Sequence, residues 1–251
     1  MKNIAYLFFV FLFLVSCSSK NVNMENSEEI ALANQRVGEE LYNNGNYTAA
    51  LKSLLEAKKT LPDDAYLYNS LGLVYLAKER NELAEENFKK ALKLKPDYIH
   101  AKNNLGAVYL KQGKWALAIH YFKDVAENIL YATPEIAFSN LGWSYFHQKM
   151  YEEAKTYFRK ALKIKPGFLN AVHGLSSVYI ETGFHTQAID LLQQALKENP
   201  TAAILHSDLA GVYDVLNLPD NAKKSWNTVL ELEPAGSPLA REAQKRLLEL
   251  N

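Results

Sequence analysis

The feature of this sequence that most constrains its fold is a pattern that returns about every 34 residues between residues 31 and 236. A small residue stands at the eighth position of each copy, and these residues are Gly38, Gly72, Gly106, Gly142, Ser176 and Ala210. An alanine follows twelve residues later in every copy, at Ala50, Ala84, Ala118, Ala154, Ala188 and Ala222. Four residues beyond it stands a large apolar residue: Leu54, Phe88, Phe122, Phe158, Leu192 and Trp226. A repeat of this length predicts a stack of small structural units that share one core.

Each copy has the pattern of two helices joined by a turn. Apolar residues recur at helical spacing in both halves, and glycine-containing turns divide three of the copies at Gly45, Gly113 and Gly183. A proline stands near the end of each copy except the third, at Pro62, Pro96, Pro166, Pro200 and Pro234. Proline ends a helix because it lacks the N–H donor and clashes with the preceding turn. The small residues let the helices lie close together, and the large apolar residue fills the gap between them.

This pattern resembles the tetratricopeptide repeat at each of its signature positions. The resemblance implies an all-α fold, a right-handed superhelical solenoid of six helix-pair repeats over residues 31–236. Residues 237–251 then form a capping helix, because the last repeat would otherwise expose an apolar face. Its side chains Leu239, Ala243, Leu247 and Leu250 are expected to face the last repeat.

The first 16 residues predict a signal peptide, with Lys2 followed by an uncharged, almost wholly apolar run from Ile4 to Val15. The run is too short for a membrane-spanning helix, which needs about 20 residues. Residues 14–17, Leu-Val-Ser-Cys, resemble the lipobox of bacterial lipoproteins. The resemblance implies a covalent lipid on Cys17, with residues 17–30 as a lipidated N-terminus and flexible tether. The alternative is a plain secretory signal with a chance cysteine. In the lipoproteins that this segment resembles, an aspartate directly after the cysteine acts as an inner-membrane retention signal. Ser18 stands there instead, so the resemblance implies that the protein is located at the periplasmic face of the outer membrane.

Charge and motifs exclude several classes of function. The chain has 28 Lys and Arg against 28 Asp and Glu, which argues against a nucleic-acid partner. No phosphate-binding loop, nucleophile elbow or paired-histidine zinc motif is present. The signal, tether, repeats and cap together account for this sequence and leave no segment for a catalytic domain. We therefore expect no enzyme activity, no metal site, no small-molecule substrate and no cofactor beyond the lipid.

In tetratricopeptide repeats, positions 2, 5, 9 and 12 of the first helix commonly line a groove. Among the residues at these positions in the six repeats, those expected to form a partner-binding groove are Tyr42, Tyr66, Asn69, Leu73, Leu76, Asn103, Leu110, Ile136, Trp143, Phe146, His173 and Ile180. Exposed apolar residues often mark binding sites, and the amides could bond a peptide backbone. The alternative is that these side chains pack within the superhelix.

The lipobox, tether and six repeats together resemble the type IV pilus biogenesis lipoproteins, the pilotins of the outer-membrane secretin. The most specific segment joins the third and fourth repeats, where Leu130, Tyr131, Pro134 and Glu135 match that family's junction. The resemblance implies an outer-membrane lipoprotein that binds secretin subunits and promotes their localisation and multimerisation. The alternative is a periplasmic adaptor that docks cell-wall hydrolases or synthases, with the same anchor and repeats.

Overall fold

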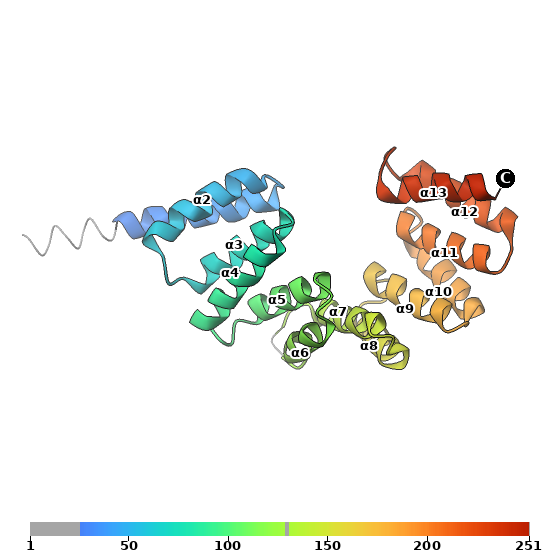
Figure 1. Cartoon of the computed structure of the whole chain (residues 1–251), viewed down its shortest axis with the longest axis horizontal. Helices are drawn as coiled ribbons and strands as arrows, with labels where there is room; N and C mark the ends of the chain where they lie inside the picture. The colour runs from blue at the N-terminus through green and yellow to red at the C-terminus, as the bar shows by residue number, and fades with distance from the viewer. Residues whose placement is uncertain (1–25, 129–130, 251) are drawn as a thin grey trace, which may run out of the picture. The chain divides into compact units, whose positions relative to one another are not determined.

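The computed structural model describes residues 26–128 and 131–250, and every regular element in that part of the chain is helical (Figure 1). The predicted signal peptide, Cys17 and the first part of the predicted tether lie outside the described residues. The chain divides into two compact units, unit 1 from Met1 to Val108 and unit 2 from Tyr109 to Asn251, with the division inside α5.

The helices follow the predicted pairs. In unit 1, residues 26–43 are helical, and they are followed by α2 (Tyr47–Thr60), α3 (Ala65–Ala77), α4 (Asn81–Leu94) and most of α5 (Ile99–Lys111). In unit 2 the order is α6 (Trp115–Ala126), α7 (Pro134–His147), α8 (Tyr151–Ile164), α9 (Leu169–Glu181), α10 (His185–Glu198), α11 (Ala203–Val215), α12 (Pro219–Leu232) and α13 (Pro238–Glu249). Successive helices pack on each other, as α3 does on α4 and α11 on α12. The predicted all-α architecture of helix pairs is confirmed.

Residues 26–30, which the sequence placed in the flexible tether, are already helical. The acidic pair Glu28 and Glu29 lies near the start of this helix, where negative side chains interact favourably with the helix dipole. These five residues are exposed, and the first buried apolar side chain is Ala31. The polar composition that suggested a tether therefore describes an exposed helical turn at this point.

The glycines of the pattern are required by close packing between the two helices of a pair. A Cβ added to Gly38 would lie 2.6 Å from Leu54, and one added to Gly72 would lie 2.5 Å from Phe88. The same contact joins Gly142 to Phe158 at 2.6 Å. The three large residues are fully buried. The structure therefore has the predicted packing, in which a small residue on one helix contacts a large apolar residue on the other.

The turn within each pair has one residue with positive φ. Glycine occupies it in three repeats, at Gly45, Gly113 and Gly183, and the other three use Glu79, Lys149 and Asn217. The latter have φ of 58°, 60° and 53°. Only glycine adopts this conformation without steric cost. The turn geometry is therefore kept in all six repeats even where the glycine signal is absent.

Proline marks the end of the second helix in five pairs. Helices α2, α4, α8, α10 and α12 each end two residues before their proline. At the unusual junction between the third and fourth repeats, Pro134 instead begins α7, a position that needs no N–H donor. Tyr131 is buried there, while Leu130 lies outside the described residues.

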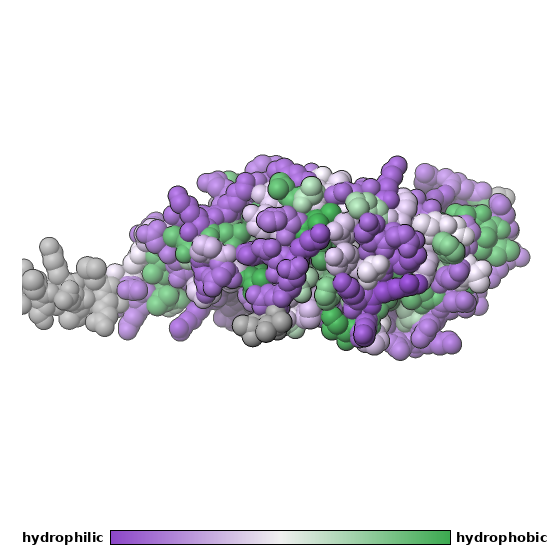
Figure 2. Space-filling model, turned by 90° about the horizontal axis from the view of Figure 1, so that it is seen from below, coloured by the Kyte–Doolittle hydropathy of each residue, from purple (hydrophilic) through white to green (hydrophobic). Residues whose placement is uncertain are grey.

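The core of each unit is made of the facing sides of the helix pairs. In unit 2 it extends to α13, where Ala243 is buried and Leu239, Leu247 and Leu250 pack against the last pair. The predicted cap is therefore present, and Ser237 caps its N-terminus by accepting a hydrogen bond from Ala240 N at 3.1 Å. Elsewhere, the face drawn in Figure 2 is mostly hydrophilic with small hydrophobic patches.

Candidate functional site

The first helices of three successive repeats in unit 2 lie side by side, because α9 packs against both α7 and α11. We call the outward side of these helices the first-helix face of unit 2. It consists of Ile136, Trp143, Phe146, Asn170, His173, Ser177, Ile180, Asp208, Gly211 and Asp214. All of them except the exposed Asn170 are half-buried, so most of their side chains are partly accessible.

Trp143 lies at the centre of this face. Its ring centroid is 5.4 Å from that of Phe146 and 5.0 Å from that of His173. Its indole Nε1 donates a hydrogen bond to Oδ1 of Asn170 at 3.0 Å. On the core side, the buried ring of Phe158 meets it edge-to-face at 5.4 Å. These contacts fix the indole on several sides, so it forms a rigid and partly exposed apolar platform.

His173 continues the face from Trp143 to α11. Its Nδ1 lies 2.7 Å from Oδ2 of Asp208, so the ring donates to the carboxylate through that nitrogen. Ser176 Oγ lies 2.8 Å from the His173 backbone oxygen and 3.3 Å from the same Asp208 oxygen. The serine hydroxyl therefore bonds to the acid and the backbone rather than to the imidazole. A general base that activates a serine needs a direct bond to its hydroxyl. The three residues thus form a structural network and do not have the geometry of a nucleophilic triad.

A second aromatic contact extends this cluster toward α6. The rings of Trp115 and His147 stack with centroids 4.6 Å apart and an angle of 15° between their planes. His147 also lies 6.0 Å from Trp143, centroid to centroid. Burial against these rings lowers the pKa of His147, because desolvation disfavours the charged imidazolium.

Unit 1 carries a different set of groups on its first helices. The ring of Tyr66 is 48% exposed and lies 5.0 Å from that of Tyr98. Lys95 Nζ donates to the Tyr66 hydroxyl at 2.6 Å, and the same ammonium lies 4.7 Å from the centre of the Tyr66 ring. Burial, followed by the neighbouring Tyr66, Glu39 and Asp64, raises the pKa of Tyr98 to about 12.

Amide groups form the floor beside these tyrosines. Asn104 Nδ2 donates to Oδ1 of the buried Asn69 at 2.9 Å, which joins α5 to α3. Ser70 donates to Glu39 at 2.7 Å. Oδ1 of Asn103 is enclosed and has no hydrogen-bond partner among the described residues. Most amides here therefore bond to protein groups, and that of Asn103 has spare capacity.

The structure divides the predicted groove residues between the two units. Trp143, Phe146 and His173 form one cluster, and Ile136 and Ile180 lie on the same helices, α7 and α9. Four residues lie on α3: Tyr66, Asn69, Leu73 and Leu76. Tyr42 is half-buried beside Tyr47, and Asn103 and Leu110 are half-buried on α5. That these residues bind a partner stays a prediction.

Sequence reasoning missed three members of the unit 2 cluster, His147, Asp208 and Trp115, and placed Asn170 at groove position 2 without its bond to Trp143. Asn170 and His147 belong to the first helices, but their partners are visible only when neighbouring repeats are stacked. Asp208 stands one residue after repeat position 5, the position that was expected to face the groove. Trp115 opens a second helix and reaches the cluster through His147. Of these residues, only Trp115 could have been suspected from the sequence. A large aromatic side chain at the start of a helix is expected to pack against another side chain.

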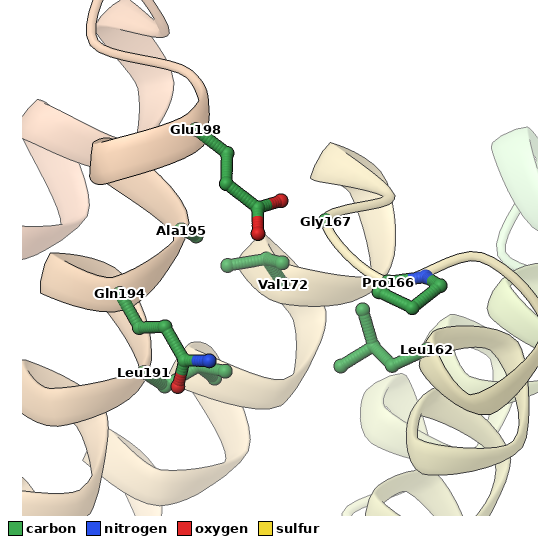
Figure 3. Close-up of a pocket in the computed structure, with 8 residues that line it drawn as sticks. All are labelled: Leu162, Pro166, Gly167, Val172, Leu191, Gln194, Ala195 and Glu198. Carbon is green, nitrogen blue, oxygen red and sulfur yellow. The ribbon is translucent and has the colours of Figure 1, made fainter.

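A separate small pocket lies away from this face, between α8, α9 and α10. It has a volume of about 170 Å³ and is lined by Leu162, Pro166, Gly167, Val172, Leu191, Gln194, Ala195 and Glu198. Figure 3 shows Glu198 extending from α10 toward Gly167, with Leu162 and Pro166 on the opposite side. Its size suits one side chain. No predicted groove residue lines it.

Residues 26–128 and 131–250 contain neither a metal-binding cluster nor a membrane-spanning helix. No group of three or more His, Cys, Asp or Glu in this part is placed to hold a metal ion. None of the described helices combines the length and apolar character needed to cross a membrane.

Comparison with known protein families identifies the repeat. Residues 63–129 and 136–168 match tetratricopeptide-repeat families. Together with the helix pairs, these matches show that the chain has the tetratricopeptide-repeat fold, which serves as a scaffold for protein interaction.

Solved structures with the same fold include the following two. One is titled "Crystal structure of PilW, widely conserved type IV pilus biogenesis factor"; it has a TM-score of 0.76 and 21% identity, and the alignment covers 85% of this chain and 98% of that one. The other is PilF of Pseudomonas aeruginosa, with a TM-score of 0.71, 21% identity, and coverage of 88% of this chain and 99% of that one. At this identity the likeness shows the fold alone.

Among curated proteins, anaphase-promoting complex subunit 3 of Schizosaccharomyces pombe is 30% identical over 118 residues, 47% of this chain and 18% of that protein. The chain spans about a fifth or less of the length of the curated relatives it matches. The likeness is confined to repeats and says nothing about the rest of those proteins.

Proposed function

We propose that this protein is an outer-membrane lipoprotein that binds subunits of a secretin and promotes their localisation and multimerisation in type IV pilus biogenesis. The observation that carries the proposal is the first-helix face of unit 2, where Trp143 and Phe146 stay partly exposed within a rigid network. An exposed aromatic cluster with satisfied polar neighbours suits the docking of an apolar segment.

The assignment to pilus biogenesis is supported by two independent features. The alignment with PilW covers 98% of that chain and 85% of this one, so the two share their fold over most of their length. The junction segment with Tyr131 and Pro134 resembles the same junction in the pilotin family. Neither feature identifies the partner segment, and the choice of the secretin rests on the family resemblance.

Lipidation of Cys17 is the second part of the proposal. Acyl chains contribute about 0.8 kcal/mol per buried methylene, and several together give stable anchoring. An anchored scaffold raises the effective concentration of bound subunits at the membrane. Ring closure by the subunits would then be favoured without any catalytic step.

The test is deletion of the gene in its own host, followed by gels of separated membranes that preserve secretin multimers. Wild type and Cys17→Ala are supplied for rescue. Loss of multimers on deletion, with Cys17→Ala forming rings in the wrong membrane, supports the proposal. Unchanged multimers in the deletion strain would overturn it, and a periplasmic adaptor for cell-wall enzymes would take its place.

A further inference from the structure

We propose that the first-helix face of unit 2 selects a segment in which a Lys or Arg side chain lies over Gly211, between Asp208 and Asp214, next to an apolar residue on Trp143. This inference rests on the proposed function, because it names the chemistry of the segment that the scaffold would bind. Three observations carry it: the open space at Gly211, the charge of the three helices, and the position of the two aspartates.

Gly211 differs from the other helical glycines whose surroundings are described. A Cβ added to Gly38, Gly72, Gly142 or Gly174 would lie within 2.7 Å of a core side chain. A Cβ added to Gly211 would meet nothing within 4 Å. Glycine is less favourable than alanine in the interior of a helix, so internal packing does not account for it. A glycine here leaves room for another molecule to approach the backbone of α11 closely.

The charge of this face favours a cationic occupant. Helices α7, α9 and α11 contain no Lys or Arg, and their acidic residues are Glu135, Glu181, Asp208 and Asp214. The chain as a whole has equal numbers of acidic and basic residues. The basic residues of unit 2 therefore lie on other elements, for example Lys155, Arg159, Lys160 and Lys163 on α8. Opposite charge on a partner segment would steer it to this face and fix its register.

Asp208 and Asp214 stand three residues before and three residues after Gly211 on α11, so the two positions flank it. Side chains three apart on a helix have Cβ atoms about 5–6 Å from each other. A cation over Gly211 would therefore lie near both carboxylates. Asp208 is held by His173, and Asp214 Oδ2 accepts from Trp226 Nε1 at 3.0 Å.

The second oxygen of Asp214 is enclosed and has no hydrogen-bond partner among the described residues. An enclosed carboxylate oxygen without a donor is unfavourable, and a donor from outside would improve it after a small side-chain rotation. Asp208 connects through His173 to the Trp143 platform. A segment with a cation and an apolar residue side by side therefore matches the order of groups on the face. The apolar stem of Lys or Arg can also lie on the rings beside it.

The experiment selects short random peptides on phage against the full chain in detergent, and then measures the synthesised peptides by fluorescence anisotropy. Binding is compared for wild type, Gly211→Leu, and the double variant Asp208→Asn/Asp214→Asn. The Cβ of the leucine would meet nothing within 4 Å, and the rest of its side chain would occupy the space proposed for the segment. Asparagine keeps acceptor oxygens in place while it removes the charge. The controls are Gln187→Leu and Glu153→Gln, exposed positions on α10 and α8.

We expect selected peptides to combine Lys or Arg with an aromatic or aliphatic residue, and both test variants to weaken binding by about tenfold or more. Replacing the peptide's cation by glutamine should weaken wild type and leave the Asp variant unchanged. If Gly211→Leu blocks binding but the Asp variant and the peptide's charge have no effect, the charge inference is wrong and the groove remains. If neither test variant changes the affinity for the peptides, the segment does not bind at Gly211. The first-helix face of unit 2 then no longer supports the proposed function.

Discussion

Unit 1 and unit 2 use the same helix pair but present different chemistry on their first helices. In unit 1, α3 has no charged residue, and its exposed Tyr66 is bonded to Lys95. In unit 2, Trp143 is bonded to Asn170, and the acids of α9 and α11 have no Lys or Arg beside them on α7, α9 or α11. The internal packing positions are nearly identical in kind, with Phe88 and Phe158 in equivalent sites. The packing residues are therefore alike in the two units, while the first-helix residues differ between them.

The largest expected effect comes from removing the large core residue of either unit. Phe158→Ala and Phe88→Ala each delete a fully buried ring and should lower the free energy of unfolding by about 3–5 kcal/mol. Urea unfolding measures both. Only Phe158 contacts Trp143, so only Phe158→Ala should change tryptophan fluorescence in the folded state. A similar fluorescence change in Phe88→Ala would contradict the separation of the two units, because no tryptophan lies in unit 1.

The second effect separates a packed glycine from an open one within unit 2. The Phe158 ring is wedged between Gly142 and Gly174, and a Cβ at Gly174 would lie 2.2 Å from it. Gly174→Ala should therefore destabilise the protein by about 1–3 kcal/mol through overpacking. Gly211→Ala should stabilise it by up to about 1 kcal/mol, since the helix gains a better residue. Thermal unfolding of the two variants should shift in opposite directions. A loss of stability in Gly211→Ala would mean that the space there is not open.

The third effect tests the turn that the two units share. Glu79 in unit 1 and Lys149 in unit 2 hold positive φ without being glycine. Replacing either by glycine should raise the free energy of unfolding by about 1 kcal/mol, because a Cβ is strained in this region. Gly113→Ala at the same turn position should lower it by a similar amount. Equal stability of all three variants in urea unfolding would show that the turn is not strained.

The smallest effect belongs to unit 1 and appears at alkaline pH. The pKa of Tyr98 is raised to about 12, above its unfolded value of about 10. Below pH 10 the tyrosine is neutral in both states, so its titration does not change the free energy of unfolding with pH there. Above that value the unfolded chain loses the proton first, and stability falls as pH rises toward 12. Tyr98→Phe should flatten this fall in urea unfolding between pH 9 and 11, and an unchanged slope would contradict the assignment.

Much of the fold could be predicted because the repeat places residues with simple physical roles at fixed spacing. Glycine against a large apolar residue recurs in four of the six repeats, and proline after the second helix recurs in five. Each feature has one structural explanation. The positive φ of Glu79, Lys149 and Asn217 could not be predicted from the sequence, because none of them is glycine. Their conformation is imposed by the stacking of neighbouring helices and not by their own preference.

The candidate site was predictable only in part. Trp143, Phe146 and His173 stand at repeat positions that were expected to line a groove, and their rings form one cluster. The bonds to Asn170 and Asp208 join residues that are 27 and 35 positions apart in sequence, and they depend on how one repeat stacks on the next. Periodicity within a helix gives no information about such contacts. The special status of Gly211 also appears only when the space around it is known.

The most direct test of the account measures binding between the purified full chain in detergent and the secretin of its own host. Wild type is compared with Trp143→Ala and Tyr66→Ala, with circular dichroism and thermal unfolding to check that both variants fold. We predict that Trp143→Ala weakens binding by about tenfold or more, as expected for a central aromatic anchor, and that Tyr66→Ala has a smaller effect. A folded Trp143→Ala variant that binds the secretin as tightly as wild type would contradict the central claim that the first-helix face of unit 2 holds the partner.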